Sequence, residues 1–244
     1  MKKSLLVFSI IVVMMLSLSA CTIDMVSGSG HLITETRKVS GYDSVVFSAI
    51  GDVTITQGAT EGLTIEAEDN IMPKIVTEVR GTQLYIGFDR PNSQDVVRPT
   101  KDIKFTLSVK NLNLVEMDGV GSVTAASFEA DKLTVKIGGA GSIKITGLSA
   151  TSLSAVMGGA GNVELAGKVT SLDATMSGVG NFACGDLQTQ TAKINLTGAG
   201  GATVWAANSL DVSIPGAGTV SYYGSPKITK NVTGLGVLNQ LGSK

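Results

Sequence analysis

A pair of glycines separated by one residue recurs seven times in the second half of this chain, at intervals of 18 to 20 residues. The pairs are Gly119/Gly121, Gly139/Gly141, Gly159/Gly161, Gly178/Gly180, Gly198/Gly200, Gly216/Gly218 and Gly234/Gly236. A fixed period of this length is typical of a solenoid, in which each repeat stacks on the previous one and buries a shared core. The repeat therefore predicts stacked coils.

Apolar and polar residues alternate on both sides of each glycine pair. In one copy the apolar positions are Leu133, Val135 and Ile137 before the pair, then Ile143 and Ile145 after it. A period of two indicates strands with one buried face, so the Gly-x-Gly is a corner between two strands. The middle residue, such as Ala140, is expected to fill the inside of the bend. These features predict an all-β, single-chain parallel β-helix (β-solenoid) of 18–20 residues per coil, with irregular N-terminal coils.

The stretch KIGGAGSIKI (136–145) also resembles a nucleotide-binding loop. A dinucleotide fingerprint requires a third glycine three residues after the second, followed by a helix. Lys144 holds that position here, with Glu164 in the next copy, and no helical pattern follows. The glycines are therefore interpreted as corner residues that tolerate positive φ, and no cofactor is expected.

Few residues in the chain carry reactive chemistry. The net charge of −1 lacks the basic surplus of a nucleic-acid-binding protein. His31 is the only histidine and lies in the expected tether. A histidine-based triad or a multi-histidine metal site therefore cannot be built within one chain. Cys184 shares the register of inward residues and is expected to pack in the core. Asp173, Lys193 and Asp211 are equivalent in successive coils and are interpreted as cross-strand charge pairs. No catalytic residue or metal site is predicted.

The N-terminus carries an export signal. Lys2 and Lys3 precede an apolar run over residues 5–18, and the segment LSAC (18–21) resembles a bacterial lipobox. We expect a signal peptide at 1–20, acylation of Cys21 and a flexible tether at 21–36, so the membrane is a partner through this lipid. A plain signal peptide cut after Ala20, or an uncut anchor, remains an alternative. Thr22, in place of the aspartate that retains enterobacterial lipoproteins at the inner membrane, favours an outer-membrane location in a Gram-negative host.

The remaining chain, 37–244, is expected to form one domain whose regular coils begin near residue 111. In its N-terminal part, apolar and polar residues alternate over 44–58, 62–68 and 82–88, which predicts strands there. Asp69 or Asn70 is expected to cap a short helical turn within 71–79, and 89–102 is expected to be a surface loop.

Two segments, RKVSGYDSVVFSAIGDVTITQG (37–58) and LTIEAEDNIMPKIVTEVRGTQLYIG (63–87), together with the MDGVGSV and GGAGSI coils, carry a family resemblance. The chain resembles the putative auto-transporter adhesin head GIN domain family, in its bacterial lipoprotein form. The resemblance implies a β-helix-like fold on the cell envelope and supplies no catalytic residues. We expect a non-enzymatic envelope lipoprotein of the binding or adhesion type. The alternatives are a carbohydrate-active β-helix protein that binds or cleaves polysaccharide, and a structural envelope component that assembles end to end through exposed coil edges.

Two aromatic residues, Trp205 and Tyr223, are the predicted ligand or partner site. Counting from the glycine corners places them in one outward column, which holds small residues in the earlier coils at Ala126, Thr146, Ala166 and Gly185. The two rings are expected to lie side by side, about 4.8 Å apart along the stack. They would form an apolar platform for a glycan or a protein, unless the segment after Tyr223 folds back and covers them as a cap.

Overall fold

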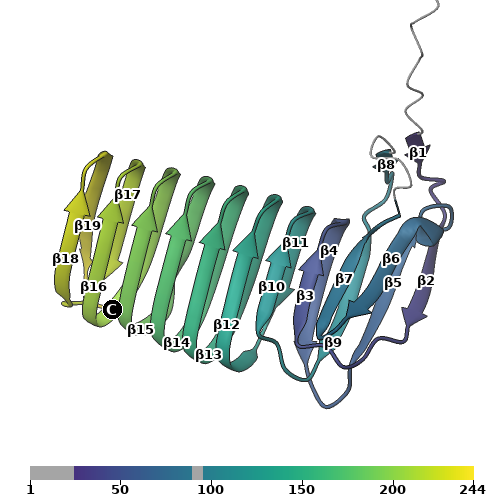
Figure 1. Ribbon diagram of the computed structural model, residues 1–244, viewed down its shortest axis with the longest axis horizontal. Coiled ribbons are helices and arrows are strands. Elements are labelled where there is room, and N and C mark those ends of the chain that lie inside the picture. The colour runs from purple at the N-terminus through teal and green to yellow at the C-terminus, as the bar shows by residue number, and fades with distance from the viewer. Residues whose placement is uncertain (1–24, 90–95) are drawn as a thin grey trace, which may run out of the picture.

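Stacked β-coils dominate the computed structural model, which describes residues 25–89 and 96–244 (Figure 1). The regular strands are β10 (Leu114–Met117), β11 (Val120–Ala125), β12 (Phe128–Ile137), β13 (Ala140–Met157), β14 (Ala160–Met176), β15 (Val179–Leu196), β16 (Ala199–Ile214), β17 (Ala217–Tyr223), β18 (Lys227–Val232) and β19 (Leu235–Gly242). Every pairing among these strands is parallel, and equivalent glycines are register partners, as in Gly121–Gly141–Gly161. The predicted parallel β-helix is confirmed.

Each corner is closed by glycines that have no room for a side chain. Gly121 has a φ of +141°, a region that favours glycine. A Cβ atom added to Gly159 would collide with the carbonyl oxygen of Gly139 in the preceding coil. The middle residue, however, does not fill the bend as predicted. Val120 and Val179 are 53% and 62% exposed, so this position points to solvent. The inside of the corner has space only for the glycine backbones of neighbouring coils.

The core of the solenoid consists of ladders of apolar side chains from equivalent positions. One inward ladder contains Leu133, Leu153, Leu172, Ala192 and Leu210, all buried. Cys184 lies in the core with no exposed surface, as predicted. Its thiol pKa is raised to about 12 because burial penalises the thiolate.

The N-terminal part holds β1 (Met25–Ser27), β2 (Leu32–Arg37), β3 (Ser44–Phe47), β4 (Ile50–Gln57), β5 (Gly62–Glu68), the 3₁₀ helix η1 (Met72–Lys74), β6 (Ile75–Arg80), β7 (Gln83–Phe88), β8 (Val96–Arg98) and β9 (Lys104–Val109). Parallel pairs β3–β7 and β4–β9 continue the stack. Antiparallel β5, β2 and β6 then end it. Phe47 and Phe105 fill the junction edge to face, with ring centroids 5.1 Å apart.

From Met25 onward the chain differs from the predicted flexible tether. β1 pairs with β8, and β2 pairs with β5. The carboxylate of Glu68, fully buried, accepts hydrogen bonds from the amides of Gly30 (2.7 Å) and Thr100 (2.9 Å) and from the Thr100 hydroxyl. Burial pushes the pKa of Glu68 up, but these hydrogen bonds outweigh it and hold the pKa below its usual value. Glu68 thus fastens the N-terminal segment to the domain.

Two local predictions in this region need correction. The helical turn is η1, which begins after Ile71 without a side-chain cap. Asp69 and Asn70 instead bind Ser29, whose hydroxyl donates to Asp69 and whose amide donates to Asn70. The predicted surface loop contains β8, whose pairing with β1 connects segments too distant in sequence for local patterns to predict.

Candidate functional site

Trp205 and Tyr223 lie next to each other on β16 and β17. They are direct register partners, and both are partly exposed. The buried hydroxyl of Thr189 donates a 2.8 Å hydrogen bond to the backbone oxygen of Trp205 and holds this strand in place. The structure thus brings the two predicted site residues together as neighbours on one surface.

The column does not continue to Gly185 as the sequence count predicted. Cys184 pairs with Val204, but the next pair is Gln188 with Trp205, because a bulge in β15 adds residues at this point. Gly185 has a different role: a Cβ atom added to it would lie 3.2 Å from the ring of Tyr223. The glycine therefore leaves room for the aromatic ring to pack against the bulge.

The C-terminal segment does not fold back over the aromatic pair. Its strands β18 and β19 form a further parallel coil on β16 and β17. Only Lys244 reaches back, with its ammonium group 4.8 Å from the centre of the Tyr223 ring. The same group donates a 2.7 Å hydrogen bond to the oxygen of Gly185 and forms an ion pair with Asp186. The result is a partly exposed apolar surface with charged and hydrogen-bonding groups at its border.

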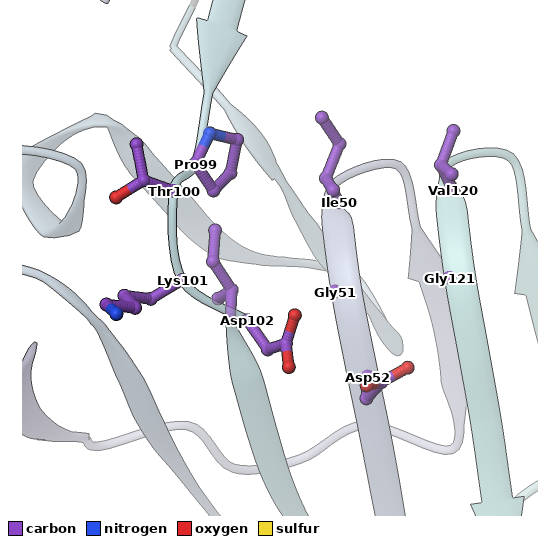
Figure 2. A pocket seen from close by; sticks show the side chains of 10 residues that line it. Ile50, Gly51, Asp52, Pro99, Thr100, Lys101, Asp102, Val120 and Gly121 are labelled. Carbon is purple, nitrogen blue, oxygen red and sulfur yellow. The ribbon is translucent and has the colours of Figure 1, made fainter. Parts of the chain in front are cut away.

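A cleft of about 290 Å³ separates the regular coils from the loop that precedes β9 (Figure 2). Ile50 and Val120 stand at its apolar side, and the carboxylates of Asp52 and Asp102 line its polar side. The hydroxyl of Ser122 donates a 2.6 Å hydrogen bond to Asp52. The cleft can accept hydrogen bonds from a hydroxyl or ammonium group. Sequence patterns missed it because it depends on the position of the loop at 99–103.

Lys101 lines the cleft, and a second lysine close to it, Lys104, is held by a carboxylate outside the cleft. Lys104 donates a 2.8 Å hydrogen bond to Glu66, which is the main cause of its raised pKa, and Asp102 and Asp52 add to that effect. Within residues 25–89 and 96–244, no group of three or more histidine, cysteine or acidic side chains is arranged to hold a metal ion.

The charged ladder on the outer surface has the predicted register. Asp173, Lys193 and Asp211 are successive partners and line an open groove of about 480 Å³. No ion pair joins Lys193 to either aspartate in the part of the chain that the structure describes. A different pair from adjacent coils, Lys144–Glu164, does form an ion pair, with 2.7 Å between nitrogen and oxygen. The alternating charges are thus a solvated surface.

The remaining predicted residues lie apart from these surfaces. His31 is exposed just before β2, and its backbone oxygen accepts a hydrogen bond from Asp69. Cys21 and the predicted signal peptide fall outside the described residues. Among the residues that are described, no helix has both the length and the apolar character needed to cross a membrane.

Fold and surface together define a class: a parallel β-solenoid with an antiparallel N-terminal end and a small aromatic patch on two successive coils. The chain belongs to the family described as "Putative auto-transporter adhesin, head GIN domain", whose sequence profile matches residues 41–226. The resemblance predicted from the sequence is confirmed. No curated protein matches the chain.

Solved structures from Bacteroides and Parabacteroides species share this architecture. A putative adhesin from Bacteroides fragilis is 28% identical, with a TM-score of 0.82 over 88% of this chain and 100% of that chain. A putative lipid binding protein from Parabacteroides distasonis is 22% identical, with a TM-score of 0.71 over 89% of this chain and 100% of its own. A putative adhesin from Parabacteroides merdae is 20% identical, with a TM-score of 0.63 over 89% and 99%. The last two similarities concern the fold alone.

Proposed function

We propose that this protein is a non-enzymatic binding protein of the cell envelope, whose solenoid presents Trp205 and Tyr223 to a glycan or protein ligand. The observation that carries the proposal is the pairing of the chain's single tryptophan with a tyrosine on an outer surface. Large aromatics are mostly buried, and adjacent exposed rings supply apolar area that stacks on sugar rings or protein side chains. The adhesin descriptions of the family and of the Bacteroides fragilis protein agree with such a role.

The lipid anchor is part of the same proposal. Cys21 would carry the acyl group, and the mature chain would begin there, four residues before β1. The lipobox-like LSAC segment and the family description support an envelope location, with the outer membrane as the expected site in a Gram-negative host.

A glycan array probed with the protein tests the ligand proposal. Replacement of Trp205 and Tyr223 together by alanine should abolish the glycan or envelope binding that the parent protein shows. The matched control is Tyr85→Ala, because Tyr85 also carries a cation, Arg80, 4.8 Å from its ring centre. Equal loss in the control, or full binding by the double variant, would refute the platform. Turnover of a bound sugar would refute the non-enzymatic assignment.

A second candidate function, end-to-end assembly, has one observation in its favour. Among the described residues, β18 and β19 form the last coil of the stack, and Ile228, Val232 and Val237 are exposed there. Unpaired strand edges can template association. Lys230, however, is the partner of buried Val212 and places a charge at an inward position, which opposes stacking. A mass that rises with protein concentration would support assembly.

A further inference from the structure

The outer surface of the Gly-x-Gly corners, here called the corner edge, has an apolar middle residue in every coil of the solenoid. Its most prominent positions are the middle residues of the corners: Ile50, Val120, Ala140, Ala160, Val179, Ala199, Ala217 and Leu235. Val120, Val179 and Leu235 are 53%, 62% and 88% exposed. Eight coils at the strand spacing make this edge about 34 Å long.

Charge is almost absent from this edge. The positions two residues before the middle residues complete it: Ser48, Asp118, Gly138, Gly158, Ser177, Thr197, Pro215 and Thr233. Asp118 is the only charged residue in the two columns. The opposite side of the coils, the return arc, differs, with exposed charges at Glu129, Asp131, Lys132, Lys168 and Asp186. A long edge with a single charged residue on one side, and an arc with several charges on the other, favour an apolar medium as the surroundings of the edge.

A second apolar surface lies on the same side of the molecule. In Figure 1, β1 and β8 stand at the upper edge of the molecule, where the corners also lie. Met25 is the direct partner of Val96, and the two side chains are 56% and 44% exposed, whereas Val97 between Val96 and Arg98 is buried. The outward face of this ribbon therefore shows two apolar side chains beside the cation of Arg98.

The short chain before β1 keeps the two apolar surfaces near the membrane anchor. Three residues, 22–24, lie between Cys21 and Met25, and the four steps from one to the other span at most about 14 Å in an extended chain. If the apolar run ending at Leu18 stays uncut instead, six residues lie between Leu18 and Met25, and the seven steps span at most about 25 Å. Either anchor keeps the ribbon close to the lipid surface. At such short range the effective concentration is high, so a weak apolar contact is sufficient.

We propose that the lipid bilayer is the partner of the corner edge and the β1–β8 ribbon, so that the solenoid lies along the membrane on its glycine corners. The proposal rests on the membrane anchor of the proposed function. From Val120 to Ala217 the middle residues of the corner edge are only alanine and valine, a row without large anchor side chains that suits a lipid surface better than a protein partner. The C-terminus, Lys244, lies at the opposite edge in Figure 1 and then faces away from the membrane. Its ammonium contacts the ring of Tyr223, the partner of Trp205, so the aromatic pair lies on that far side as well.

Two matched cysteine probes test this orientation in the full chain. Ala160→Cys places an environment-sensitive fluorophore on the corner edge, and Ser149→Cys places it on the exposed return arc. The parent chain gives the background label, since Cys184 is buried. The protein is reconstituted through its own anchor into vesicles of phosphatidylethanolamine and phosphatidylglycerol. The corner probe should lose most of its emission to nitroxide-labelled lipid and resist aqueous iodide, and the arc probe should do the reverse.

Every other outcome refutes the proposed orientation and shows which part of the proposal is wrong. Sedimentation with vesicles, but equal iodide quenching of both probes, would leave the anchor valid and refute the docking. A corner probe protected from both quenchers would indicate a protein contact, such as a second copy. Failure to sediment would refute anchor and docking together. As a further check, Val179→Asp should restore iodide access to the corner probe, and Thr146→Asp on the arc should not.

Discussion

Replacement of Gly159 by alanine should destabilise the protein far more than its partly exposed position in a bend suggests. The added Cβ would collide with the backbone oxygens of Gly139 and Gly138. To relieve the clash, the two coils must separate at the corner. The hydrogen bonds from the Gly159 amide to Ile137 (3.0 Å) and from the Ala160 amide to Gly139 (3.0 Å) hold them together and would weaken.

The magnitude follows from those two hydrogen bonds. Each contributes a net 0.5–1.5 kcal/mol, so their loss costs about 2 kcal/mol. For a chain of this size 1 kcal/mol lowers the melting temperature by roughly 2–4 °C, which gives a shift of about 4–8 °C. Thermal unfolding followed by circular dichroism measures it. The control, Ala160→Val, adds bulk one residue away at an outward position and should shift the melting temperature by less than about 2 °C. Equal melting temperatures for the two variants would refute the close stacking of the corners.

Three further predictions concern the termini and the core. Because the pKa of Glu68 is depressed in the folded state, its contribution to stability is present above the unfolded value of 4.5 and is lost as the pH falls through the lower folded value. Amide exchange in residues 28–30 and 100–101 should therefore accelerate below pH 4.5, and Glu68→Gln should remove that pH dependence; protection that stays constant in acid would contradict this role. Cys184, whose thiol pKa is about 12, should react with iodoacetamide only after unfolding, and rapid labelling of the native protein would be inconsistent with its burial. Cys21→Ser should move the protein from the membrane fraction to the soluble fraction after cell lysis, and unchanged sedimentation would argue against acylation.

The regular coils were predictable because their signals are local and repeated. The spacing of the glycine pairs and the alternation around residues 133–145 define the period, the strands and the buried faces. The corner geometry was only half predicted: the glycines are required, but Val120 and its equivalents point outward. A sequence cannot show that distinction, because both faces of a tight corner tolerate small apolar residues.

The predictions that failed concern features that depend on contacts between residues far apart in the sequence. The pairing of Met25 with Val96 depends on how the chain returns from β7, and the buried carboxylate of Glu68 depends on that same return. The bulge after Cys184 shifts the register of β15 against β16, and counting residues from the glycine corner cannot predict this shift. It removed Gly185 from the aromatic column while leaving Trp205 beside Tyr223. The adjacency of the two candidate residues, Trp205 and Tyr223, was predictable because no bulge lies between either residue and its glycine corner in the pairing of β16 with β17.

Fluorescence of Trp205 during ligand binding tests the central claim most directly. The chain has a single tryptophan, so its emission reports the aromatic pair without any label. The protein is titrated with the glycan or envelope fraction that it retains, and emission and iodide quenching are recorded at each step. We predict a blue shift and a loss of iodide access that saturate together with binding, and that are absent for a Tyr223→Ala variant that has lost the ligand. Saturable binding that leaves the emission and the quenching of Trp205 unchanged would place the ligand elsewhere and contradict the account.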